Sequence, residues 1–273
     1  MRIVVAYRGI PHAPGRAFGD TMIRVFTDLG HEAVPYGRWY QTARWMGTDA
    51  TGDLLLYLEC NDADEQYHEL RYFDGKRVYW AFDAGMERRN QPNLVRCDAA
   101  FNTNRLYGGL YCGAKIEYLP VAFDTTSMAP FRGTRFGAAI IGTAFPERVA
   151  FADALGIHVI DPPSVFYPRF VSGLKVHVHA HNSSGPGVLV SRIWETMGLG
   201  VALLAPRTPE LEELFTDGVH CVMYDGVEDA RAKLIALLTD DAVRKTVAKR
   251  GRAEILKKHT FRHRALQILE AVA

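Results

Sequence analysis

Residues 175–206 constrain the fold of this chain more than any other stretch. Over 175–181 apolar side chains alternate with the histidines at 177, 179 and 181, which predicts a strand with the three histidines on one face. A Gly/Ser-rich segment at 182–187, a helix over 188–197 and an apolar strand ending at Pro206 follow. This order predicts an α/β fold with a parallel sheet. The loop amides and the N-terminus of the helix converge, which predicts an anion site.

The composition excludes several classes of protein. Of 273 residues, 48% are hydrophobic and 23% charged, and the formal net charge of +1 provides no general attraction to nucleic acid or to an anionic membrane. The four cysteines lack CxxC spacing, so we expect free thiols in a reducing compartment. With no signal peptide and no apolar run of about 18 residues, we expect a cytoplasmic protein without stable membrane insertion, of open oligomeric state.

Strands and helices alternate along the chain and predict two lobes. Strands are expected at 2–7, 31–37, 53–59, 76–83, 97–103 and 116–120, with helices at 16–29, 64–73 and through 111. The irregular segment 121–135 predicts a linker, after which strands at 136–143, 157–163, 201–206 and 220–225 alternate with helices at 146–155, 209–215, 227–238 and 240–258. The first loop lacks GxGxxG, which disfavours a dinucleotide dehydrogenase.

The second half resembles a known family. The ordered series of an Arg-aromatic-Glu helix, a Gly pair before a strand, and a terminal block with Gly251, Arg252, His259, Thr260 and Arg264 resembles spore-maturation-protein-type glycosyltransferases related to family 4. The resemblance implies the GT-B fold, an α/β architecture of two Rossmann-like lobes with mostly parallel sheets facing a central cleft. We expect an N-terminal acceptor-side lobe at 1–125, a donor lobe at 126–260 and a C-terminal helix at 261–273 that crosses back to the first lobe.

The resemblance also implies the chemistry. It implies metal-independent, retaining transfer of a sugar from a nucleoside-diphosphate sugar, with no cofactor. Family 4 enzymes carry two glutamates eight positions apart; Glu195 occupies the second position, which binds the ribose, and Gly187 stands at the first, which faces the sugar. A carboxylate suits ribose hydroxyls because it only accepts hydrogen bonds.

Two arginines are candidates for the diphosphate. Arg192 shares the helix with Glu195, and Arg148 begins the helix after Gly142 and Thr143. A guanidinium matches phosphate oxygens with paired donors, although a surface ion pair between Arg192 and Glu195 is the alternative. The remaining donor-binding candidates come from the loop after the histidine strand, namely His181, Asn182 and Ser183.

Catalysis and acceptor binding are expected in the first lobe. Asp83 ends a predicted strand and could take the proton of the acceptor hydroxyl, with His12 in the first loop as a rival. Arg8, Trp39 and Trp45 are acceptor-side candidates, although segment 38–52 could instead be a helix that packs its aromatic side chains on the core. The acceptor could be a glycan, a small molecule or a modified nucleobase in DNA.

Two other classes of function compete with transfer. The Gly187 departure permits a sugar-nucleotide-binding module without activity. The three alternating histidines permit a metal-dependent hydrolase, since an HxH pair on a strand can hold zinc. No Cys or carboxylate partner motif accompanies these histidines, so we expect no metal site.

Overall fold

The computed structural model describes residues 1–7, 18–38, 45–58, 72–82, 97–105, 110–111, 114–130, 133, 136–162, 166–180 and 189–273. These residues form two compact units, Met1–Val121 with Phe261–Ala273, and Ala122–Thr260. The first boundary therefore lies at 121 in the structure and at 125 in the sequence analysis.

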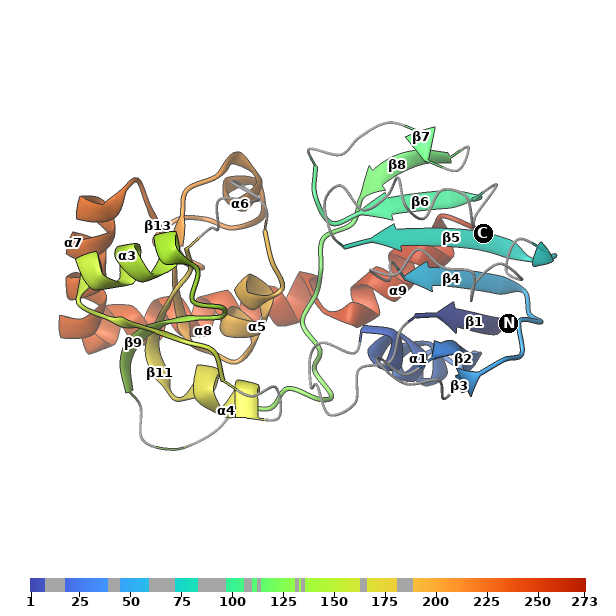
Figure 1. Ribbon diagram of the computed structural model, residues 1–273, viewed down its shortest axis with the longest axis horizontal. Coiled ribbons are helices and arrows are strands. Elements are labelled where there is room, and N and C mark those ends of the chain that lie inside the picture. Colours follow the sequence, from blue (N-terminus) through green and yellow to red (C-terminus); the bar gives the residue numbers. More distant parts are fainter. Residues whose placement is uncertain are drawn as a thin grey trace. The chain divides into compact units, whose positions relative to one another are not determined.

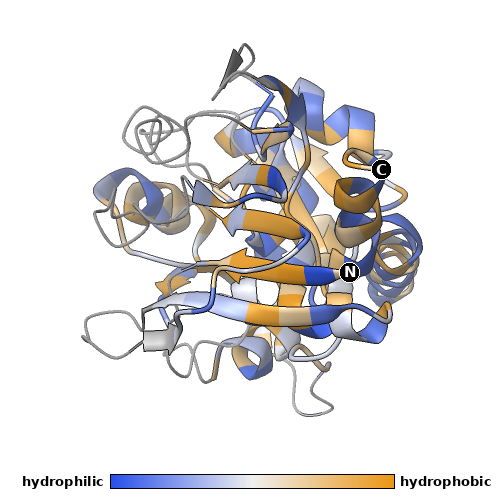
Figure 2. Ribbon diagram, turned by 90° about the vertical axis from the view of Figure 1, so that its right-hand side faces the viewer, coloured by the Kyte–Doolittle hydropathy of each residue, from blue (hydrophilic) through white to orange (hydrophobic). Residues whose placement is uncertain are grey.

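The first unit is built on an eight-stranded sheet (Figure 1). Its strands, in the order of the sheet, are β3 (Trp45–Gly47), β2 (Glu32–Arg38), β1 (Arg2–Ala6), β4 (Leu54–Leu58), β5 (Lys76–Ala81), β6 (Ala99–Asn102), β8 (Ala114–Tyr118) and β7 (Leu110–Tyr111). The six inner strands are parallel, and β3 and β7 add antiparallel edges. Parallel strands are covered on both faces, which explains why residues 3–6 of β1 and all of β4 are apolar or aromatic and buried. Figure 2 shows this hydrophobic character along β1, which starts beside the N-terminus.

Helices α1 (Phe18–Asp28) and α9 (Phe261–Glu270) belong to this unit. The ring of Phe261 lies 5.5 Å from that of Phe18 and 6.2 Å from that of the fully buried Trp80. Arg264 of α9 is buried and donates from Nε to the carbonyl oxygen of Pro120 at 2.7 Å. Burial lowers the pKa of Arg264 to about 10. The aromatic contacts and this hydrogen bond attach α9 to the first unit.

The second unit has a five-stranded, fully parallel sheet. Its order is β10 (His158–Ile160), β9 (Phe136–Ile141), β11 (Leu174–Val178), β12 (Ala202–Pro206) and β13 (Val222–Tyr224). The helices are α3 (Pro146–Leu155), α4 (Tyr167–Ser172), α5 (Arg192–Gly198), α6 (Pro209–Leu214), α7 (Val227–Thr239) and α8 (Asp241–Lys258). The core lies between this sheet and the helices, with Val176, Val178 and Leu204 fully buried.

Local sequence signals set several ends of these helices. Asp240 caps α8 by accepting from the backbone N–H groups of Ala242 and Val243, both at 2.9 Å. Pro146 occupies the first turn of α3, and Gly156 ends that helix with φ of 67°. These signals explain why the bounds of α3 and α8 lie close to those expected from the sequence.

The helix considered for 38–52 is wrong where the structure describes this segment. Trp45–Gly47 forms edge strand β3, with Gly47 paired antiparallel to Gly37 of β2. A Cβ at Gly47 would lie 2.1 Å from the carbonyl oxygen of Pro35, so only glycine permits this close approach. The pairing with β2, rather than local propensity, decides the conformation.

Two further expectations are corrected. A helix was expected up to residue 111, but Leu110–Tyr111 forms strand β7, which pairs antiparallel with β8. The helix expected from 188 begins later, as α5 at Arg192, and Leu189 and Val190 are not helical.

The packing of α8 generates a stability prediction. A Cβ at Gly251 would lie 2.3 Å from the carbonyl oxygen of His220. In Gly251→Ala, the overpacking should outweigh the gain in helix propensity of about 1 kcal/mol, so the free energy of unfolding should fall by about 1–2 kcal/mol. Urea unfolding measures this change. Gly137→Ala is the control, since a Cβ at Gly137 would meet no atom within 4 Å, and a loss as large there would contradict the packing argument.

Candidate functional site

Two guanidinium groups converge on Gly142, the residue that follows β9. A Cβ at Gly142 would lie 3.0 Å from Cζ of Arg192 and 3.2 Å from Nη1 of Arg148. The φ of Gly142 is 132°, a conformation that favours glycine. Its N–H donates to the carbonyl oxygen of Ile160 at 2.8 Å. Gly142 therefore lets both cations approach the carboxyl end of the second sheet.

Backbone carbonyl groups hold Arg148 in place. This side chain from the first turn of α3 is only 6% exposed. Its Nη1 donates to the carbonyl oxygen of Thr143 at 2.7 Å, and its Nη2 donates to that of Ala180 at 3.3 Å. Burial lowers the pKa of Arg148, and the nearby charge of Arg192 lowers it further. Its hydrogen-bond partners are thus neutral carbonyl groups, which do not cancel the positive charge.

Arg192 brings a second positive charge to the same point. It is the first residue of α5, and its buried Nε has no hydrogen-bond partner among the described residues. The buried Nε of Arg148 likewise has none within that part of the chain. Two buried donors on adjacent cations form a site that would be stabilised by an anion with several oxygens.

His177 is a neutral side chain buried close to this pair of arginines. It is fully buried on β11, its Nδ1 lies 2.5 Å from Oγ1 of Thr196, and its Nε2 accepts from the N–H of Ile141 at 3.3 Å. Since Nε2 accepts, Nδ1 carries the proton and donates to Thr196. Burial lowers the pKa of His177 to about 3, and the charges of Arg192 and Arg148 add to this effect.

The same contacts bear on the metal-dependent alternative. Both ring nitrogens of His177 are engaged in hydrogen bonds, so this histidine has no lone pair directed at a metal. His179 is also buried, and His181 lies outside the described residues. Among the described residues, no group of three His, Cys, Asp or Glu side chains could hold a metal ion.

Glu195 lies one turn after Arg192 and is only 4% exposed. Its Oε2 accepts from the hydroxyl of Tyr167 in α4 at 2.5 Å. Nothing in the sequence points to Tyr167, because it lies 28 positions from Glu195 and no local motif joins the two residues. Tyr167 fixes the orientation of the carboxylate.

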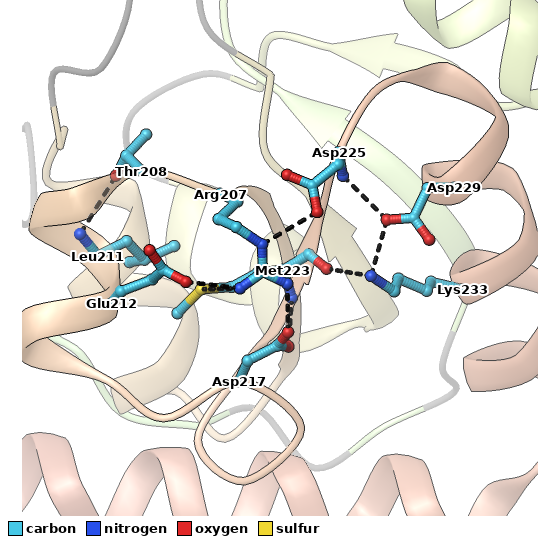
Figure 3. A network of polar contacts seen from close by, with 9 residues as sticks. All are labelled: Arg207, Thr208, Leu211, Glu212, Asp217, Met223, Asp225, Asp229 and Lys233. Carbon is cyan, nitrogen blue, oxygen red and sulfur yellow. Dashed lines mark hydrogen bonds and ion pairs between the residues drawn. The ribbon is translucent and has the colours of Figure 1, made fainter.

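A third arginine at this edge of the sheet is neutralised. Figure 3 shows Arg207, which follows β12, surrounded by carboxylates: it donates to Glu212 at 2.7 Å, to Asp217 at 2.6 Å and to Asp225 at 3.0 Å. Hydrogen bonds to Asp217, Glu212 and Asp225 raise the pKa of Arg207. This cluster therefore ties the ends of β12 and β13 together and leaves no net positive charge for an anion.

The structure brings together part of the predicted donor set. Gly142, Thr143, Arg148 and Arg192 meet at the carboxyl ends of β9 and β11, and Glu195 lies on the same helix as Arg192. Trp45 lies on β3, and nothing is described of its side chain. The other predicted site residues lie outside the described residues: Arg8, His12, Trp39, Asp83, His181, Asn182, Ser183 and the Gly187 position.

Comparisons with known proteins identify the family and the fold. Residues 132–270, just over half of the chain, match the family model described as glycosyl transferase-like. No curated protein sequence matches the chain. None of the helices within the described ranges is long and apolar enough to cross a membrane.

Several solved structures are similar over nearly the whole chain. An alpha-glucosyltransferase in complex with UDP-glucose and DNA containing an abasic site is 12% identical, with a TM-score of 0.68 and 100% of both chains covered. HepE from Anabaena in complex with UDP and glucose is 13% identical, with a TM-score of 0.65 and 98% of both chains covered. T4 phage BGT in complex with its UDP-glucose substrate is 12% identical, with a TM-score of 0.66, covering 100% of this chain and 99% of that one. These likenesses confirm the predicted GT-B fold.

The environment of His177 generates a pH prediction. Its pKa is lowered to about 3 in the folded state, against 6.5 as the ordinary value, so the unfolded chain binds more protons between these two pH values. The contribution of His177 to the free energy of unfolding is therefore fully present above pH 6.5. As the pH falls below 6.5, this one residue lowers the free energy of unfolding by up to about 1.4 kcal/mol per pH unit. Urea unfolding of the wild type and of His177→Gln between pH 7 and pH 5 measures the difference. Parallel pH dependences in the two proteins would contradict the assignment.

Proposed function

Since the chain belongs to the glycosyl transferase-like family, and is therefore a glycosyltransferase, we propose that it transfers a sugar from a nucleoside-diphosphate sugar to an acceptor hydroxyl. The observation that carries this proposal is the convergence of Arg148 and Arg192 on Gly142. A diphosphate has the charge and the several oxygens that two adjacent guanidinium groups recognise.

The pair of arginines also suits the chemistry of the leaving group. Breaking the bond between sugar and phosphate increases negative charge on the diphosphate. Preorganised cations that are held by backbone carbonyl groups stabilise this charge without reorganising during the reaction. We therefore propose that Arg148 and Arg192 do what a divalent metal ion does in other transferases, so that turnover persists in excess EDTA.

Glu195 is our proposed ligand of the ribose. The hydroxyl of Tyr167 uses one acceptor position of the carboxylate, which has about four in total. We propose that the ribose hydroxyls donate to this oriented carboxylate, as the family 4 resemblance implies. The loop residues His181, Asn182 and Ser183 complete the proposed donor site.

Experiments can identify the sugar donor and the acceptor. The similar structures contain UDP or UDP-glucose, so we propose a uridine nucleotide first, tested by thermal shift against UDP-, GDP-, ADP- and dTDP-sugars. For the acceptor, a glycan, a small molecule and a modified nucleobase in DNA are to be screened. Retention, which the family 4 resemblance implies, is tested by the anomeric NMR signal of the product.

The donor site generates a prediction with two variants. Arg192→Ala should weaken binding of UDP about tenfold or more, by the same factor for 2′-deoxy-UDP, because it removes a contact to phosphate. Glu195→Gln should weaken UDP more than 2′-deoxy-UDP, because it removes the charge that accepts from the ribose hydroxyls. Isothermal titration calorimetry measures both. Unchanged UDP affinity in Arg192→Ala, with the variant folded, would refute the donor site.

Catalysis is proposed for Asp83, with His12 as the rival and with Arg8, Trp39 and Trp45 on the acceptor side. In Asp83→Asn, turnover should fall by about 10²–10⁴-fold while UDP affinity stays within about twofold, since a general base acts on the acceptor and not on the nucleotide. Single-turnover assays at saturating donor measure this split. An equal loss of turnover and UDP affinity would remove Asp83 from the catalytic role, and His12→Ala then becomes the informative variant.

A further inference from the structure

A basic pocket lies on the second unit, against helix α8. Its volume is about 750 Å³, and five cationic side chains line it: Lys175, Arg244, Lys245, Lys249 and Arg252. The described residues of its lining include no carboxylate. The pocket therefore has the size of a small-molecule site and a strong preference for anions.

The cations of α8 form one stripe. Lys245, Lys249 and Arg252 are spaced by four and three residues, so they lie on the same face of the helix. At a rise of 1.5 Å per residue, Lys245 and Arg252 are about 10 Å apart along the helix axis. A single phosphate is too small to contact both ends of this stripe, whereas a ligand with two or more phosphate groups is long enough.

One cation of the stripe is anchored. Nε of Arg252 donates to the carbonyl oxygen of Gly198 at 3.0 Å, at the end of α5. Gly200 follows with φ of 76°, and a Cβ there would lie 3.4 Å from Cδ of Arg252. The hydrogen bond to a neutral carbonyl fixes the guanidinium without cancelling its charge, as is also the case for Arg148.

The positive charge of the pocket is only partly compensated. Asp241 pairs with Arg244 and, at 3.0 Å, with Lys245. Lys175, Lys249 and Arg252 form no ion pair with any residue that the structure describes. Three cations from β11 and α8 are therefore left to a ligand.

The pocket is separate from the donor site. Lys175 is the second residue of β11, and Gly200 precedes β12, so the pocket lies at the amino ends of these strands. Arg148 contacts the carbonyl oxygen of Ala180, beyond the carboxyl end of β11. At about 3.3 Å per residue, five residues of extended chain separate the two places by about 16 Å. One nucleotide diphosphate cannot occupy both.

We propose that this pocket binds a small ligand that carries at least two phosphate groups, distinct from the sugar donor. Lys175, Lys249 and Arg252 bind the phosphates, and the apolar wall formed by Leu199, Ala248 and Leu256 contacts the rest of the ligand. A nucleic acid backbone is disfavoured, because the cations of this site are gathered in one pocket.

Tripolyphosphate is the probe, titrated by calorimetry into the full chain carrying Arg192→Ala, so that the donor site contributes little. Adding Lys175→Ala and Lys249→Ala should weaken binding about tenfold or more, because two charge-assisted contacts are lost. Arg250→Ala is the matched control, since this exposed arginine lies next to Lys249 in sequence but is absent from the pocket lining. It should change the affinity by less than about twofold.

UDP binding to the chain with native Arg192 separates this proposal from the donor site. The double variant Lys175→Ala with Lys249→Ala should leave the affinity for UDP unchanged. The UDP titration therefore tests the donor site, and the tripolyphosphate titration tests the pocket, independently of each other. The proposal is overturned if tripolyphosphate does not bind, or if Arg250→Ala weakens it as much as the double variant. It is equally overturned if a single-stranded oligonucleotide binds at least about tenfold more tightly than tripolyphosphate and loses that affinity in the double variant.

Discussion

The proposed donor site depends on two like charges that lie next to one glycine. Arg148 is held by the carbonyl oxygens of Thr143 and Ala180, and Gly142 leaves room for the guanidinium groups of Arg148 and Arg192. Carbonyl groups satisfy hydrogen bonds without neutralising a cation, whereas carboxylates do both. The repulsion between the two guanidinium groups favours an anion at this point.

The parallel sheet explains how residues distant in sequence reach that point. All five strands of the second unit run in one direction, so the segments after β9, β11 and β12 emerge at one edge. His177 helps to hold α5 against β9, because its ring forms one hydrogen bond with Ile141 of β9 and one with Thr196 of α5. A neutral imidazole is required there, since a charged one would add a third cation to a buried pair.

The sequence predicted the position of a residue correctly where that position follows from the end of a strand or the start of a helix, whereas the donor-binding roles stay predictions. Gly142, Arg148 and Arg192 lie at the ends of strands or the starts of helices, and such positions are legible in the sequence. Sequence reasoning failed where distant pairing decides the outcome. The strand β3 exists because Gly47 can approach Pro35, and the Tyr167–Glu195 hydrogen bond and the Arg207 cluster join residues whose proximity only the fold creates.

The histidines at 177 and 179 also show what a sequence pattern leaves undetermined. Their alternation correctly predicted a strand, but period-two spacing states only which residues share a face, not what covers that face. In the structure the face is buried, and burial converts a pattern typical of metal ligands into a packed, hydrogen-bonded side chain at 177.

The net charge of the chain does not show where positive charge is available, because some cations are paired with carboxylates and others are not. Arg207 is matched by three carboxylates, and Asp241 is shared by two cations. Arg148 and Arg252 are each fixed by carbonyl oxygens and keep their charge. The type of partner, carbonyl or carboxylate, therefore decides whether an arginine keeps its positive charge or is neutralised, and a total of +1 conceals that difference.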